Sequence, residues 1–154
     1  MKKSCVGIFL VCIVVCIALG VTVFTAHTST PSLTHEYERE LLTIGNAVVT
    51  ADIADTPEKR VLGLSGRSTL LPDTGMLFIF DTPGPHDMWM KDMHFSIDIL
   101  WLDEAYEIIH IERRVSPDTY PTSFGSPIPA SYVLEVPAGF TSTYHVKVGD
   151  TIGT

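Results

Sequence analysis

Cysteine is missing from almost the whole chain. The 154 residues contain three cysteines, and all of them, Cys5, Cys12 and Cys16, lie near the N-terminus. The sequence after them therefore has no thiol nucleophile, no thiolate metal site and no disulfide framework. A domain formed there must be stabilised by its hydrophobic core, and we expect no cofactor.

Basic residues are also scarce. Lysine and arginine together number 10 against 18 acidic residues, which gives a formal net charge of −8. When Lys2 and Lys3 are set aside, 8 basic residues remain against 18 acidic ones, a balance of −10. No basic stripe is left to neutralise phosphates, so we expect no nucleic-acid partner. The length after the N-terminal segment allows one domain, at roughly 100–150 residues per domain.

Long apolar runs are absent except for one, at the N-terminus. Lys2 and Lys3 precede the run from Val6 to Ala26, which is 21 residues long and uncharged. A bilayer needs about 20 apolar residues, and a basic flank of this kind stays in the cytoplasm. The pattern predicts a single-pass anchor in the cytoplasmic membrane, with the C-terminal domain outside the cytoplasm.

Two alternatives to the anchor are compatible with the same segment. The small residues of Ala18-Leu19-Gly20 form a signal-peptidase pattern, so the protein would be secreted after cleavage. Cys16 suggests lipidation, although it follows Val15 where a lipobox has a small residue. In the anchored case, residues 1–26 are the membrane anchor or signal peptide, 27–40 are a tether and 41–154 are the domain.

The region after residue 40 has the pattern of a mainly β domain with one or two short helices. Thr56, Pro57 and Glu58 form a helix start, because threonine caps free amides and proline suits the first turn. Most of the remaining segments are short, rich in β-branched and aromatic residues, and separated by Pro, Gly and Asp. We expect strands in the ranges 42–44, 47–51, 76–80, 88–90, 95–102, 107–111, 132–136 and 147–152.

The segment from Phe95 to Trp101 alternates clearly. Phe95, Ile97, Ile99 and Trp101 share one face, and Asp98 lies on the other, which predicts a half-buried antiparallel strand. Many short strands with little helix favour a small β-sandwich or a partly closed barrel. The irregular stretch 116–130 contains four prolines, and loops of that length often carry function.

The domain contains six motif segments in a characteristic order: 58–67, 75–80, 88–93, 97–99, 134–139 and 148–150. Together they resemble the motifs of a known family, the domain of unknown function 192 family. The resemblance implies a compact, mainly β domain, often exported, in bacteria and archaea. It implies no reaction, because the family is uncharacterised. One departure is Ser96, which stands where such sequences usually have proline.

The densest group of chemically versatile side chains lies between His86 and His94. If this segment is extended, His86, Met88 and Met90 share one face. Thioether and imidazole ligands together suit copper outside the cytoplasm, so one hypothesis is a copper-binding domain. The alternative is that the methionines fill the core. The candidate metal ligands are His86, Met88, Met90, Met93 and His94.

A second group suggests a binding pocket. Its candidate residues are Trp89, Lys91, Asp98, Glu135 and Arg67. Two carboxylates about 5–10 Å apart, such as Asp98 and Glu135, would suit a small hydrolase of envelope carbohydrate, with an indole stacked on the sugar. The alternative is that both carboxylates accept backbone amides or pair with a cation, and that Trp89 is core.

The function that these patterns favour is binding rather than turnover. A cysteine-free small β domain offers a recognition surface but no complete catalytic set in its sequence. We therefore expect a membrane-tethered extracytoplasmic module that binds an envelope glycan or protein ligand. The hydrolase and the copper-binding domain remain the alternatives, and the sequence leaves the oligomeric state open.

Overall fold

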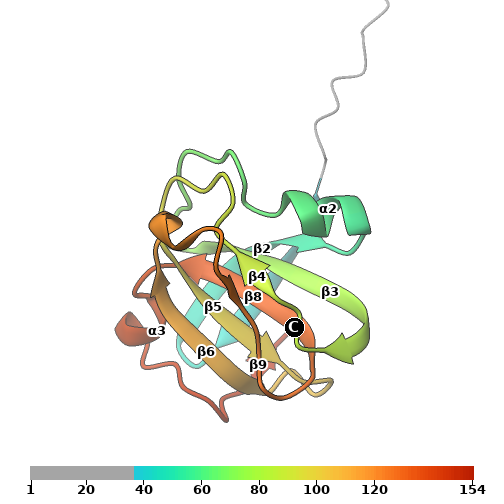
Figure 1. The fold of residues 1–154 in the computed structure, drawn as a ribbon. Coiled ribbons are helices and arrows are strands. Elements are labelled where there is room, and N and C mark those ends of the chain that lie inside the picture. The colour runs from blue at the N-terminus through green and yellow to red at the C-terminus, as the bar shows by residue number, and fades with distance from the viewer. Residues whose placement is uncertain (1–36) are drawn as a thin grey trace, which may run out of the picture. The chain divides into compact units, whose positions relative to one another are not determined.

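The computed structural model describes residues 37–154, which form a curled sheet with two short helices (Figure 1). The predicted anchor of residues 1–26 and residues 27–36 of the predicted tether lie outside this range. The elements are β1 (Arg39–Ile44), β2 (Ala47–Ala54), α2 (Pro57–Leu62), β3 (Thr74–Gly84), β4 (Met88–Trp89), β5 (Ile97–Leu102), β6 (Ile108–Val115), the 3-10 turn η1 (Pro117–Thr119), β7 (Ser123–Phe124), β8 (Ala130–Pro137), α3 (Phe140–Thr143) and β9 (Ile152–Gly153).

Seven strands form the main sheet, in the order β6-β5-β8-β3-β2-β1-β9. All neighbouring pairs are antiparallel except β2 and β3, which run parallel and are connected through α2. β4 and β7 form a separate two-stranded ribbon. The sheet curls into a half-barrel (Figure 1), so the mainly β prediction with short helices is confirmed, in its partly closed form.

Both faces of the sheet are covered. Leu100 and Leu102 of β5 belong to one core cluster, whereas Ile99 and Trp101 belong to another on the opposite face. The predicted alternation of this strand is therefore correct, but the prediction that it is half-buried is wrong. All six residues of β5 are buried, because β5 is an interior strand with a core cluster on each side.

The helix start predicted at residue 56 is present. The Thr56 hydroxyl accepts from the amide of Lys59 at 3.3 Å, and Pro57 occupies the first turn. The strand predicted over 147–152 is shorter than expected. Residues 147–150 form a turn in which the Lys147 amide donates to the Asp150 carboxylate, and only Ile152–Gly153 pairs with β1.

Within residues 37–154, no helix has the length and apolar character needed to span a membrane. The first strand begins at Arg39, two residues before the predicted start of the domain. The described residues 37–154 all belong to one compact unit.

Candidate functional site

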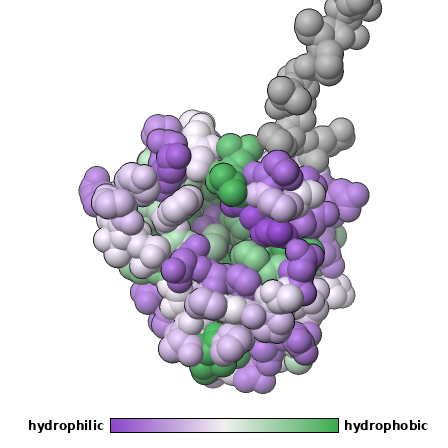
Figure 2. All heavy atoms as spheres, turned by 45° about the vertical axis from the view of Figure 1, so that its right-hand side comes forward, coloured by the Kyte–Doolittle hydropathy of each residue, from purple (hydrophilic) through white to green (hydrophobic). Residues whose placement is uncertain are grey.

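A pocket of about 300 Å³ opens between α2, β3 and the segment that includes β4. Figure 2 shows a hollow on this side of the molecule, with apolar atoms inside it and a rim that is mostly hydrophilic apart from an apolar patch at its upper edge. We call it the Glu135 pocket, after the one buried carboxyl among its lining residues. Those residues are Pro57, Arg60, Val61, Leu62, Leu64, Ser65, Phe78, Phe80, Asp87, Met88, Trp89, Met93 and Glu135.

Glu135 lies in β8, in the middle of the sheet. Its neighbours in the adjoining strands are Met76 of β3 and Ile99 of β5, so apolar residues flank it on both sides. Only 4% of the residue is exposed. Because side chains alternate along a strand, Glu135 points away from the core cluster that contains Leu134 and toward the pocket.

The Glu135 carboxyl has no hydrogen-bonding or ion-pairing partner among the described residues. Burial raises its pKa from 4.5 to about 8, and the positive charge of Arg67 opposes this change. A carboxyl that accepts no amide and pairs with no cation is costly to bury in its charged form. The Glu135 carboxyl is therefore mostly protonated at neutral pH.

Arg67 lies on the same face of the sheet but is held by another carboxylate. Its guanidinium contacts Asp52 at 2.8 Å and lies 5.4 Å from the centre of the Tyr37 ring. Asp52 also receives a hydrogen bond of 2.9 Å from Arg39. Asp52, Met76 and Glu135 occupy one row across neighbouring strands, so Arg67 acts on Glu135 through space rather than by contact.

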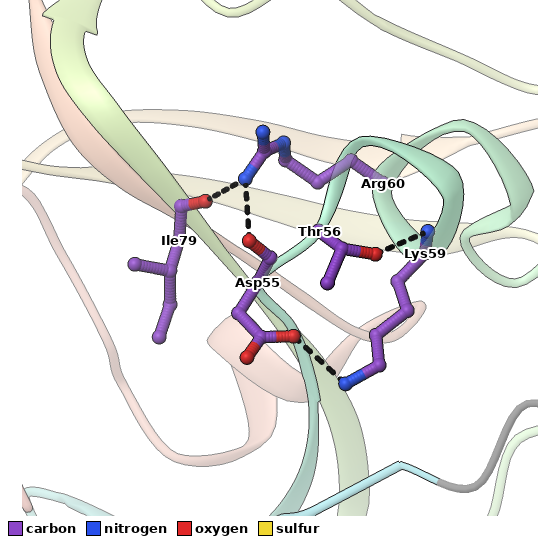
Figure 3. Close-up of polar contacts among 5 residues, drawn as sticks. All are labelled: Asp55, Thr56, Lys59, Arg60 and Ile79. Atoms are coloured by element: carbon purple, nitrogen blue, oxygen red, sulfur yellow. Dashed lines mark hydrogen bonds and ion pairs between the residues drawn. The ribbon is translucent and has the colours of Figure 1, made fainter.

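Arg60 joins one wall of the pocket to the sheet. Its Nη1 atom donates to the carbonyls of Asp55 at 2.9 Å and Ile79 at 2.7 Å (Figure 3). The register of β3 against β8 shifts between Ile79 and Gly84, at the carbonyl that Arg60 uses. The guanidinium also lies 5.5 Å from the Phe80 ring centre and 3.6 Å from Asp81. The Arg60 guanidinium therefore already has partners within the protein.

The opposite wall is the segment from Met88 to Met93. Ser65 Oγ donates to the carbonyl of Lys91 at 2.8 Å, and the Gly66 amide donates to the carbonyl of Asp92 at 2.9 Å. These two bonds connect this segment to the chain that leaves α2. Trp89 is half-exposed, so it is not a core residue, while Met88 and Met93 are buried. One indole and two thioethers thus line this side.

Asp98 does not belong to the pocket. It pairs with Val136 in β8, one position away from Glu135, so the two carboxylates point to opposite faces of the sheet. Asp98 is fully buried and accepts from the amides of Arg114, Gly139 and Thr141, and from the Thr141 hydroxyl at 2.6 Å. These bonds hold the start of α3 and the end of β6. Asp98 therefore accepts backbone amides, which is the alternative to a catalytic role given above. The geometry therefore does not support the paired-carboxylate hydrolase.

The five candidate metal ligands have different surroundings. Met90 is 1% exposed within the core, whereas His94 is exposed to solvent. The His86 ring stacks on Phe80 at 3.5 Å and its Nε2 lies 3.1 Å from the Thr82 carbonyl. Burial lowers the pKa of His86. Of the five, Met88 and Met93 line the pocket, and residues 37–154 contain no cluster of three His, Cys, Asp or Glu side chains suited to a metal ion.

Of the candidate binding residues, Trp89 and Glu135 meet in the pocket. Lys91 instead lines a neighbouring hollow beside Asp92, and residues 116–130 contribute no lining residue to the Glu135 pocket. Part of that loop supports the site, because Ser123 of β7 pairs with Trp89. Sequence reasoning missed Arg60 and the Phe78 and Phe80 rings. The alternation of Met76, Phe78 and Phe80 places these three on one face and is the signal that identifies the rings.

The comparison with known families gives one match. The model of the domain of unknown function 192 family (DUF192, uncharacterized ACR) matches residues 40–154, which include the whole pocket. The chain belongs to the domain of unknown function 192 family. No curated protein matches it.

Two solved structures are similar to this member of the family. One, from Sinorhizobium meliloti 1021 and provisionally named a transcription regulator, has 31% identity and a TM-score of 0.73 over 77% of this chain and 95% of its own. The other, a protein of unknown function from Novosphingobium aromaticivorans DSM 12444, has 21% identity and a TM-score of 0.74 over 80% of this chain and 90% of its own, and it shows the fold alone.

Proposed function

We propose that this protein is a membrane-anchored extracytoplasmic module that binds a small ligand in the Glu135 pocket without turning it over. The observation that carries the proposal is the Glu135 carboxyl, which is 4% exposed, has no partner among the described residues and lines an open cavity. A protein gains nothing in stability from such a group. A carboxyl in that position suits the recognition of a ligand.

The lining of the pocket supports binding rather than catalysis. It combines apolar and aromatic side chains with few polar groups, as ligand pockets commonly do, and its volume is at the lower end of their range. The lining contains no histidine, lysine or cysteine. Its second carboxylate, Asp87, is exposed, and Arg60 is held by two backbone carbonyls. No nucleophile with an adjacent base is present in this set.

The location outside the cytoplasm rests on the sequence. Lys2 and Lys3 before the apolar run of residues 6–26 favour an anchor whose C-terminal side leaves the cytoplasm. The domain that follows is cysteine-free and acidic. A ligand for it would then come from the cell envelope or its surroundings, such as a glycan or peptide fragment.

The proposal is tested by ligand screening on the soluble domain of residues 37–154. The Sinorhizobium meliloti structure corresponds to this domain over 95% of its own chain, so a domain of this extent folds alone. Two-dimensional NMR spectra are recorded with envelope sugars, peptidoglycan fragments and a fragment library. We expect saturable shifts at Trp89, Met88 and Glu135. If no compound in the set shifts these signals, the pocket is not a binding site.

A further inference from the structure

The chemistry of the pocket identifies a class of ligand. We infer that the Glu135 pocket takes a small organic cation, a protonated amine with an apolar body, whose ammonium group pairs with the Glu135 carboxylate. This inference rests on the proposed binding function and adds the identity of the ligand class. It follows from the charges, the aromatic lining and the burial of the Glu135 carboxyl.

The charges that face the pocket favour a cation. The two carboxyl groups in the lining are Glu135 and Asp87, and the one basic group is Arg60. Arg60 already donates to the carbonyls of Asp55 and Ile79 and lies beside Asp81, so its charge is largely compensated within the protein. Glu135 itself has apolar neighbours on both adjoining strands, and Arg67 is paired with Asp52. An anionic ligand would therefore find no available cation in the lining.

The lining also suits the apolar part of such a ligand. Trp89 is 50% exposed and offers an indole face at the pocket, and indole binds cations better than the other aromatic rings do. Phe78 and the thioethers of Met88 and Met93 supply polarizable apolar surface in the same pocket. Phe80 contributes less, because Arg60 and His86 already contact its ring.

Binding of an amine would displace a proton. Glu135 is mostly the neutral acid at pH 7, since burial raises its pKa to about 8. When an ammonium ion enters, the Glu135 oxygen loses its proton to solvent and the carboxylate pairs with the ammonium. The products are the ion pair and one free proton, so charge and atoms balance. An opposite charge at contact distance lowers a carboxyl pKa, which makes the ion pair stable at neutral pH.

The first experiment compares three probes of similar size on the domain of residues 37–154. They are 2-phenylethylamine, 2-phenylethanol and 3-phenylpropionate, which carry one positive, no and one negative charge. We expect the amine to bind about tenfold or more tightly than the alcohol at pH 8.5, and the anion not to bind. Between pH 6 and 8 the amine affinity should rise by roughly tenfold per pH unit, because deprotonation of Glu135 is coupled to binding.

The second measurement counts protons. Calorimetry of 2-phenylethylamine binding at pH 7, in buffers with different ionisation enthalpies, should report release of nearly one proton by the wild type and none by Glu135→Gln. In that variant the amine should bind no better than the alcohol. Glu104→Gln, a change of the same type at an exposed turn, is the matched control and should behave as wild type.

The outcomes separate the two proposals. If the alcohol binds as tightly as the amine, without proton release, the pocket is a binding site but the amine inference is wrong. If none of the probes shifts Trp89 or Met88 in NMR spectra, the inference is also wrong. The proposed function then depends on the broader screen alone. Tight binding of the anion would overturn the charge argument directly.

Discussion

Glu135 and Asp98 are buried carboxylates in neighbouring strands, and their surroundings are opposite. Asp98 accepts four hydrogen bonds, three of them from backbone amides, whereas Glu135 accepts none among the described residues. A buried acid that is satisfied in this way contributes to stability, and one that is not reduces it whenever it is charged. Replacing the two residues should therefore change the stability of the fold in opposite directions near and above neutral pH.

Replacing Glu135 should change how stability depends on pH. Its pKa is about 8 in the folded state and 4.5 when exposed. The folded state therefore binds the extra proton, and stability is lost as pH rises from about 4.5 through 8. At about 1.4 kcal/mol per pH unit, the loss reaches a few kcal/mol. Glu135→Gln should match the wild type near pH 4.5 and be more stable at pH 9, as measured by urea unfolding. Equal stability of both proteins at pH 9 would contradict the assignment.

Replacing Asp98 should destabilise the fold at every pH near neutrality. In Asp98→Asn, one oxygen becomes an NH₂ group that faces donors, so up to two of the four hydrogen bonds are lost. The expected cost is about 2–4 kcal/mol in the free energy of unfolding. Chemical denaturation measures this loss, with Glu104→Gln as the exposed control. A loss below about 0.5 kcal/mol would mean that Asp98 does not hold α3 and β6 together.

At the scale of elements, the shape of the pocket depends on how α2 ends. Gly63 follows the helix with φ 51° and ψ −134°, a conformation that other residues rarely adopt, and its amide donates to the carbonyl of Lys59. A Cβ atom there would lie 3.4 Å from the Phe78 ring, which lines the pocket. The glycine therefore allows the chain to turn from α2 toward Leu64 and Ser65 across the pocket wall.

Gly63→Ala should lower stability and weaken ligand binding together. We expect a loss of about 1–2 kcal/mol, since alanine is strained at this backbone conformation. Gly45→Ala is the matched variant, because Gly45 also has a positive φ, 57°, in a turn far from the pocket residues in sequence and with open space around its Cβ position. Both variants should unfold at lower temperature, but only Gly63→Ala should lower the affinity for a pocket ligand in calorimetry.

The sequence predicted much of each element but little of how elements meet. The alternation in β5 correctly placed Asp98 on the other face from Ile99 and Trp101. The helix cap at Thr56 correctly located the start of α2. The parallel pairing of β2 with β3 was not predictable, because it depends on the crossover through α2. The sequence also grouped Asp98 with Glu135, because the register between β5 and β8, which no local pattern contains, decides that the two side chains point to opposite faces.

At the scale of the whole molecule, we predict that the chain is attached to the membrane with its domain outside the cytoplasm. The apolar run of residues 6–26 should keep the full chain in the membrane fraction after an alkaline carbonate wash. A chain that begins at residue 37 should be found in the soluble fraction. Protease added to intact spheroplasts should degrade the domain of the full chain. Protection of the domain from external protease, with a cytoplasmic control equally protected, would contradict the proposed orientation.

The most direct test of the central claim is a carbon-13 NMR titration of the Glu135 carboxyl in the domain of residues 37–154. We predict a midpoint near pH 8 in the free protein, because the carboxyl is buried without a partner. With 2-phenylethylamine at saturation, the midpoint should move below 7. A midpoint near 4.5 that does not change when the amine is added would contradict the account.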